Sequence, residues 1–319
     1  MIPDISIIIV NRNRSDLLLT CLKSIYQTPC RHSFEIIVID NASIDDSARL
    51  VEQNFKNATL IRNDSNLGFS AANNQGIKIA KGKFILFLNS DTIVLENAID
   101  ALADFLEQTP DAGLCAPKLL NHDRSIQRNV YRLATFRSML ARYTILKYFG
   151  MFKNARNLYR MRDFTYDHIA KIDRTMGAAM MAKKEALDKS GLFDENYFFY
   201  FEDADLCRQF KKGGFEIYFV PHAEIIHLGG EIAKSFGSHK TDMMFYRSMF
   251  YYFRKHKGQF NTFLFSLIFK PTAILYYITE MILNFTSALV VFRKRGQKLA
   301  RAKAASLFLI RFLPEFLFC

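Results

Sequence analysis

Three polar residues, Asn89, Ser90 and Asp91, follow directly after a continuous apolar run at 84–88. A run of this length predicts a strand that is buried on both faces, as in a parallel sheet. In open parallel α/β sheets, helix N-termini surround the carboxyl ends of the strands, and nucleotides and metals bind there. Asp91 is therefore a candidate metal ligand. The alternative is a strand that ends in a turn, with Asn89 and Asp91 bonding local amides.

A second group of acids, Glu202, Asp203 and Asp205, lies within four residues. Three carboxylates this close repel one another, so at least one pKa should rise unless a cation or a helix N-terminus compensates. Carboxylates with tuned pKa values serve as general acids and bases. The alternative is an acidic helix start that only complements the helix dipole.

Alternating strand and helix patterns precede and follow these acids, which favours βαβ units and a parallel sheet. Strands are expected at 5–10, 34–39, 59–61 and 216–220, with an ordered segment at 172–181. Helices are expected near 18–25, after Ser43, and at 70–80, 95–109 and 184–190, and a further segment of the same domain at 198–213. The basic, aromatic-rich stretch at 120–171 matches neither pattern, and we expect it to be partly mobile.

The formal net charge of +12 favours an anionic partner such as a nucleic acid, a phosphate-bearing ligand or an acidic lipid surface. No nucleic-acid-binding module, glycine-rich phosphate loop or Walker loop accompanies the charge, so we expect no nucleic-acid partner. The five cysteines show no paired spacing, which is typical of a reducing compartment. The chain enters a strand at once without a signal-peptide pattern, so we expect a cytoplasmic catalytic face.

The last part of the chain, at 259–319, is apolar and then basic. Lys270, Pro271 and Glu280 interrupt the apolar stretch, so we expect in-plane or re-entrant helices on the inner face of the membrane and not a spanning helix. Six cations would lie over anionic lipid: Arg293, Lys294, Arg295, Lys298, Arg301 and Lys303. The alternative is a helical subdomain packed on the core or on a second subunit.

Five blocks occur in an order that identifies a family: Ile7–Asn13, Val38–Ser43, Asn66–Gly76, Leu88–Asp91 and Phe201–Cys207. The chain resembles the inverting family 2 glycosyltransferases of the GT-A fold, in particular the bacterial rhamnosyltransferase-like branch, over about 5–230. The resemblance implies an α/β domain at 1–258 with a Rossmann-like, mostly parallel sheet flanked by helices. Its nucleotide-binding half would be about 1–118 and its acceptor half about 119–258, followed by the helical tail.

The resemblance also implies roles for the polar residues of these blocks. Asn89 departs from the family's Asp-x-Asp motif and supplies a neutral oxygen at best, so the donor diphosphate would complete the metal site. Asp40 could instead cap a helix, Asn73 could be solvated, and His227 could be structural. The implied ligands of a nucleoside-diphosphate sugar are Asn11, Asn13, Asp40, Asn66, Gly68, Asn73, Asn89, Ser90 and Asp91, and those of a divalent cation, Mg or Mn, are Asp91, Asn89 and His227.

By the same resemblance Asp203 is the general base, and Glu202 positions the acceptor or the base. Gly177, Glu202 and Asp205 would contact the acceptor, unless Asp205 caps or braces its helix. The implied reaction moves rhamnose or another hexose to a lipid-linked glycan in cell-surface polysaccharide synthesis. Two alternatives stay open: a catalytically degenerate membrane scaffold, which Asn89 favours, and a sugar nucleotidyltransferase.

Overall fold

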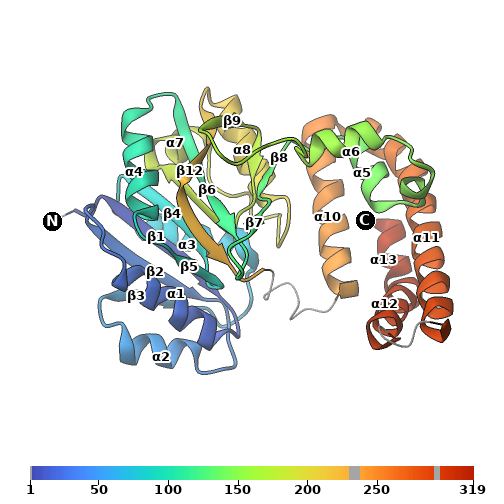
Figure 1. Cartoon of the computed structure of the whole chain (residues 1–319), viewed down its shortest axis with the longest axis horizontal. Coiled ribbons are helices and arrows are strands. Elements are labelled where there is room, and N and C mark those ends of the chain that lie inside the picture. The colour runs from blue at the N-terminus through green and yellow to red at the C-terminus, as the bar shows by residue number, and fades with distance from the viewer. Residues whose placement is uncertain (1, 230–237, 291–294) are drawn as a thin grey trace. The chain divides into compact units, whose positions relative to one another are not determined.

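The computed structural model describes residues 2–229, 238–290 and 295–319. The chain forms two compact units (Figure 1). The first contains Met1–Leu133 and Asp163–Ile232, and the second contains Ala134–Arg162 and Ala233–Cys319. The domain bounds expected from the sequence stay a prediction.

The first unit is built on a mixed sheet in the order β3-β2-β1-β4-β11-β6-β12-β5. Its parallel half consists of β1 (Ile5–Asn11), β2 (Phe34–Asp40), β3 (Ala58–Arg62) and β4 (Phe84–Asn89). The other strands are β11 (Ala179–Lys183), β6 (Ala112–Leu120), β12 (Glu216–His227) and β5 (Thr92–Val94), with β7 (Ile126–Gln127) and β9 (Ala170–Ile172) at its margins.

Helices cover both faces of this sheet (Figure 1). Alternate residues of β1 separate the two faces: Ile7 belongs to the core under α1 (Ser15–Gln27) and α4 (Ala98–Gln108), whereas Ile8 faces α3 (Gly68–Ile79). A β-carbon on Gly76 of α3 would lie 2.7 Å from Ile8 Cγ2, so the absent side chain lets α3 approach the sheet closely. The remaining helices are α2 (Ser47–Asn54), α7 (Lys184–Ser190) and α8 (Glu202–Lys212).

Several elements differ from the sequence expectation. The α2 helix begins at Ser47 and not at Ser43, since Asp45 Oδ1 accepts the Ser47 amide and holds an extra loop before the helix. The segment at 172–181 divides among three strands with different partners: β9, β11, and a ribbon in which β10 (Arg174–Thr175) pairs with β8 (Val130–Tyr131). The β12 strand continues to His227, seven residues beyond its expected end.

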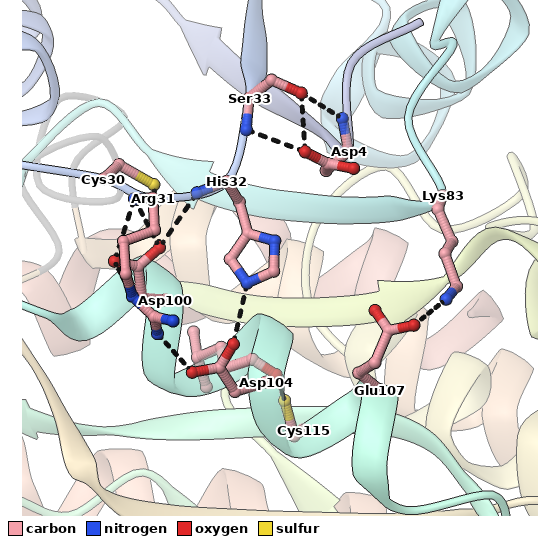
Figure 2. Close-up of polar contacts among 11 residues, drawn as sticks. Asp4, Cys30, Arg31, His32, Ser33, Lys83, Asp100, Asp104, Glu107 and Cys115 are labelled. Atoms are coloured by element: carbon pink, nitrogen blue, oxygen red, sulfur yellow. Dashed lines mark hydrogen bonds and ion pairs between the residues drawn. The ribbon is translucent and has the colours of Figure 1, made fainter.

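Carboxylates of α4 fasten the loop before β2, as Figure 2 shows. Buried Asp100 accepts the backbone amide of Arg31 at 3.1 Å and the thiol of Cys30 at 3.2 Å, and Asp104 binds His32 Nε2 at 2.8 Å. Burial raises the pKa of Asp100, but the amide and thiol donors outweigh it, so the net pKa is lowered. These contacts hold β2 at its amino end, opposite the strand ends that carry Asp40 and Asn89.

The second unit is helical and includes part of the stretch at 120–171, for which partial mobility was expected. Its helices are α5 (Phe136–Tyr143), η1 (Ile145–Phe149), α6 (Lys153–Tyr159), α10 (Ser238–Lys257), α11 (Gln259–Val290), α12 (Arg295–Leu307), η3 (Phe308–Phe312) and α13 (Leu313–Phe318). Aromatic contacts order the segment: the Phe136 ring stacks on that of Phe265 with centroids 4.6 Å apart. Lys147 also pairs with Glu280.

The expected interruption at Pro271 does not occur, because α11 continues through it. Phe265, Phe269, Ala273 and Tyr277 are buried along one side, and this packing holds the helix together across the proline. By length and composition, Gln259–Ala288 is the one helix in the described ranges that could cross a membrane, a criterion that buried helices of soluble proteins also meet. Arg293 and Lys294 lie outside the described residues, as does the side chain of Arg295.

Candidate active site

Asp91 and His227 meet at one edge of the sheet. Asp91 follows β4, and His227 ends β12, where it pairs with Thr92 of β5. His227 Nε2 lies 3.3 Å from Asp91 Oδ1, and both side chains are nearly buried, at 6% and 2% exposed. The structure therefore brings together two of the three predicted metal ligands, from positions 136 residues apart in the sequence.

Gln127 of β7 orients the imidazole of His227. Its Oε1 lies 2.6 Å from His227 Nδ1, and its Nε2 donates to the His227 backbone carbonyl at 3.0 Å. Because the Gln127 amide oxygen can only accept, His227 Nδ1 is the donor in this contact, and Nε2 is the ring nitrogen that faces Asp91. The sequence analysis missed Gln127, which carries no signal there because it lies in a two-residue strand.

The pair fits a divalent cation: a carboxylate and an oriented imidazole with a second-shell hydrogen bond are a usual donor set. Among the residues that the structure describes, no group of three or more His, Cys, Asp and Glu side chains could hold a metal. Two protein donors suit a cation that is shared with a bound diphosphate, since such ions keep several ligand positions for phosphate and water. Asn89, half-buried at the end of β4, is the candidate for a further oxygen.

The acids at the start of α8 connect to the same edge of the sheet through Gly177 and Ala178, the two residues before β11. The Asn89 amide donates to Ala178 O at 2.9 Å, and the preceding residue, Gly177, donates its amide to Asp203 Oδ2 at 3.2 Å. Two adjacent residues therefore connect Asp203 to Asn89: Gly177 contacts Asp203, and Ala178 contacts Asn89. A β-carbon on Gly177 would lie 3.5 Å from Asp203 Cβ, an ordinary contact that would narrow the space beside the carboxylate.

The turn that presents these acids is strained. Tyr200 and Phe201, which precede α8, have φ values of +71° and +67°. Left-handed backbone in two consecutive non-glycine residues costs free energy and is typical of functional sites. Phe201 is buried, and its packing holds the turn in this conformation. The first turn of α8 thus directs Glu202 and Asp203 inward.

Glu202 has the raised pKa that the sequence predicts for one of the acids. Burial raises its pKa to about 8, and the charge of Asp203 adds to the shift, against lowering contributions that include Arg174. Its Oε2 is buried and has no hydrogen-bond partner among the described residues. Glu202 is therefore mainly a neutral carboxylic acid near pH 7. The Asp203 carboxylate oxygens accept the backbone amides of Gly177 and Ala204.

Asp205 is fully buried and engaged on both oxygens. Tyr197 Oη donates to Oδ1 at 3.3 Å, and Gln209 Nε2 donates to Oδ2 at 2.5 Å. These bonds favour the bracing role over a direct contact with an acceptor.

Asn11 and Asp40 lie side by side as register partners at the carboxyl ends of β1 and β2. Both are buried, and Asn11 Nδ2 and Oδ1 and Asp40 Oδ1 have no hydrogen-bond partner in the described part of the chain. Buried polar atoms without partners are costly, so their presence favours a ligand. Asp40 does not cap α2, whose start lies seven residues further on. Asn13 is less available, because its Oδ1 accepts the Ile44 amide at 2.7 Å.

The block that begins at Asn66 has structural contacts. Asn66 Oδ1 accepts from Asn41 Nδ2 at 2.8 Å, and the buried Asn73 donates to Phe69 O at 2.9 Å. Gly68 has φ of +84°, and a β-carbon there would lie 2.7 Å from Phe198 O. The close approach expected at Gly68 is thus to the loop before α8, whose Phe198 carbonyl accepts the Phe69 amide. In this structure the block supports the acid-bearing turn, and its binding of nucleotide stays a prediction.

The comparisons with known proteins agree with this geometry. The sequence model described as "Glycosyl transferase family 2" matches residues 6–175, which is more than half of the chain. The chain belongs to this family. The prediction of the family from five sequence blocks is thereby confirmed.

The relatives of this family 2 chain include rhamnosyl- and glucosyltransferases. It is 28% identical over 207 residues to the N-acetylglucosaminyl-diphospho-decaprenol L-rhamnosyltransferase of Mycobacterium tuberculosis, covering 60% of this chain and 66% of that protein. It is 38% identical over 100 residues to the poly(ribitol-phosphate) beta-glucosyltransferase of Bacillus spizizenii, covering 30% of this chain and 16% of that one. The chain thus spans slightly less than two thirds of the mycobacterial relative.

Solved glycosyltransferase structures share the fold. The mannosyltransferase PcManGT from Pyrobaculum calidifontis, in complex with GDP-Man and Mn2+, matches with a TM-score of 0.55 and 17% identity, covering 97% of this chain and 88% of that one. S. aureus TarS matches with a TM-score of 0.52 and 16% identity, covering 98% and 90%. The predicted α/β fold of the GT-A type is confirmed.

The raised pKa of Glu202 predicts a pH-dependent stability. A carboxyl group whose pKa rises on folding makes its full contribution to the free energy of unfolding below about pH 4.5. This contribution is lost as the pH rises toward 8. Glu202→Gln imitates the neutral acid and does not titrate. The variant is expected to be more stable than the wild type at pH 8.5, by on the order of a few kcal/mol, with little difference at pH 5. Urea unfolding at both pH values measures this, with exposed Glu96→Gln as the control.

Proposed function

We propose that this protein is an inverting glycosyltransferase that moves a hexose, with rhamnose the first candidate, from a nucleoside-diphosphate sugar to a lipid-linked glycan. One observation carries the proposal: Asp91, His227 and Asp203 lie at a single edge of the sheet, where Asn89 and Gly177 connect them. The name of the mycobacterial relative supports a rhamnosyl donor and a diphospho-polyprenol acceptor.

In the proposed reaction, the acceptor hydroxyl attacks the anomeric carbon from the face opposite the diphosphate. Asp203 takes the hydroxyl proton as the new C–O bond forms. The bond to the diphosphate breaks, its electron pair leaves with the diphosphate oxygen, and the anomeric configuration inverts. Glu202, which holds a proton near neutral pH, can donate a hydrogen bond to a substrate oxygen.

Asp91, His227 and Asn89 would hold a divalent cation, Mg or Mn, which supplies positive charge at the leaving diphosphate. The mannosyltransferase PcManGT was solved in complex with Mn2+ and GDP-Man together, which supports this proposal. Asn11 and Asp40 would accept the nucleoside, since their buried polar atoms need partners.

A screen of nucleoside-diphosphate sugars tests the donor. A ligand that binds only the folded protein raises its melting temperature by mass action. We expect one donor to raise the melting temperature more with Mg or Mn than with chelator, and then to be consumed when a lipid-linked glycan is added. Metal-dependent binding without transfer would favour the degenerate scaffold. Nucleoside triphosphate consumption with a sugar phosphate would favour a nucleotidyltransferase.

We further propose that the helical unit binds the inner face of the membrane through α11. One side of α11 packs within the unit, and the opposite side is an exposed apolar stripe: Phe260, Phe263, Leu264, Leu267, Ile268, Leu275, Ile282 and Phe285. A helix with one packed side and one apolar exposed side suits the plane of the lipid interface. The cations of α12, Lys298, Arg301 and Lys303, would add attraction to acidic lipid.

Leu267→Glu with Leu275→Glu is expected to abolish co-sedimentation of the full chain with anionic liposomes, because two carboxylates would enter the apolar interface. Asn261→Glu, an exposed polar position on the same helix, serves as the control and should retain binding. Donor binding should persist in both proteins. If the double variant sediments like the wild type, or the wild type ignores acidic lipid, the stripe serves packing or oligomerisation.

A further inference from the structure

The structure places one cation, Arg174, directly on the carboxylate of Asp203. Arg174 Nη2 lies 3.4 Å from both Asp203 Oδ1 and Asp203 Oδ2. The side chains of Arg174 and Asp203 are 12% and 8% exposed. Water screens the interaction of such a pair weakly, so it is stronger than an ion pair on the surface. Neither the sequence analysis nor the proposed mechanism assigns a role to Arg174.

The ribbon of β8 and β10 holds Arg174 in place. Arg174 pairs in register with Tyr131, and its guanidinium carbon lies 5.4 Å from the centroid of the Tyr131 ring and 5.8 Å from that of Phe201. The neighbouring Asp173 binds Lys211 of α8 at 2.6 Å and Arg132 at 3.2 Å. The aromatic rings and these ion pairs fix the guanidinium with respect to the first turn of α8.

Two backbone amides also donate to the carboxylate of Asp203. The Ala204 amide donates to Oδ1 at 2.6 Å, and the Gly177 amide donates to Oδ2 at 3.2 Å. Glu202, the adjacent acid, has one buried oxygen without a hydrogen-bond partner among the described residues. Two adjacent buried carboxyls cannot both ionise without a large cost, so the pair holds one proton near neutral pH. The position of the nearest cation decides which member carries the charge.

We propose that Arg174 is a positioning residue that keeps the negative charge of the acid pair on Asp203 and the proton on Glu202. The inference rests on the proposed function, in which Asp203 takes the proton of the acceptor hydroxyl. Without Arg174, part of the population would carry the proton on Asp203, and that population has no base. Arg174 also fixes the Asp203 rotamer, so that the carboxylate keeps its direction as the acceptor enters.

Steady-state kinetics of Arg174→Met and Arg174→Lys test this role. Arg174→Met is expected to lower kcat about 10- to 100-fold, the effect of losing a hydrogen bond between charged groups, with the dissociation constant of the donor unchanged within about two-fold. Arg174→Lys retains the charge. The loss in log kcat relative to the wild type should be at most half of the loss in Arg174→Met. Near-normal kcat in the methionine variant, or no advantage of lysine over methionine, would overturn the proposal.

Arg132→Met is the matched control, since it removes a contact of the same ribbon through Asp173 but none to Asp203. If Arg174 had a structural role alone, kcat would fall in each methionine variant only in proportion to its loss of melting temperature. Arg132 is 56% exposed and Arg174 is 12% exposed, so we expect a smaller loss of melting temperature in Arg132→Met, and a kcat loss only in Arg174→Met. Equal kcat losses would contradict the positioning role.

Infrared spectra locate the proton without any turnover. At neutral pH the carbonyl band of the protonated acid in the wild type is expected to shift when the glutamate carboxyl groups carry carbon-13, and to stay in place when the aspartate carboxyl groups do. A shift of that band with labelled aspartate instead would overturn the proposal even if sugar transfer is normal. If the band behaves as expected but no donor and acceptor react, the proposed function fails and the charge distribution stands.

Discussion

Asp203→Asn is expected to lower kcat by about two to four orders of magnitude, the usual contribution of a general base. An amide cannot take the acceptor proton. The side chain keeps its shape, however, and its carbonyl oxygen can still accept the amide of Gly177 or Ala204. Donor binding should remain within a few-fold of the wild type, because the proposed donor ligands lie on other elements than α8. Initial rates of sugar transfer and donor titration measure the two effects separately.

The control for this variant is Asp188→Asn, which makes the same chemical change at an exposed position of α7. It should leave kcat unchanged. Turnover of Asp203→Asn near that of the control would remove Asp203 from the mechanism. Equal losses of kcat and of donor affinity in Asp203→Asn would indicate damage to the fold and not loss of a base.

Asp91→Ala is expected to abolish metal-dependent binding of the donor. Asp91 supplies the carboxylate of the proposed cation site, and its loss leaves only an imidazole and an amide, which bind Mg and Mn weakly. At a donor concentration about 100 times the wild-type dissociation constant, binding stabilises the wild type by about 2.7 kcal/mol. In Asp91→Ala, the donor should leave the melting temperature unchanged, whether metal or chelator is present.

Asn89→Asp tests the same site in the opposite direction. A second carboxylate at the position where the chain departs from the Asp-x-Asp motif should tighten metal binding, so that half-maximal donor binding occurs at a lower Mg or Mn concentration. The metal hypothesis is wrong if chelator leaves the wild-type transfer rate unchanged. Unchanged metal dependence in Asn89→Asp would place residue 89 outside the coordination sphere.

Local sequence patterns were sufficient to predict the parallel half of the sheet in the first unit. The apolar runs at 5–10, 34–39 and 84–88 and the stripe of α1 form the expected strands and helix, because hydrophobic periodicity is a local property of the chain. The raised pKa of one of these acids was predicted from the repulsion between sequence neighbours, although burial, which the tertiary structure creates, is the larger cause of the shift at Glu202. Family identity followed from the order of blocks.

Local pattern failed where a segment obtains its structure from distant partners. The region at 120–171 contains η1 and α6, which lack a clear periodicity, and Lys147 of η1 pairs with Glu280, more than 130 residues away. Packing of one side of α11 likewise outweighs the helix-breaking tendency of Pro271. Long-range contacts of this kind leave no signal in a sequence window.

The sequence alone determined which residue types could do the chemistry: Asp91, His227 and the acids at the start of α8. Only the tertiary structure decided their environments. The register of β11 on β4 brings Gly177 to the edge that holds Asp91 and His227, and two-residue strands bring Gln127 to His227 and Arg174 to Asp203. The physical reason is that burial, charge and orientation depend on atoms within a few ångströms in space, and the sheet brings those atoms from distant parts of the chain.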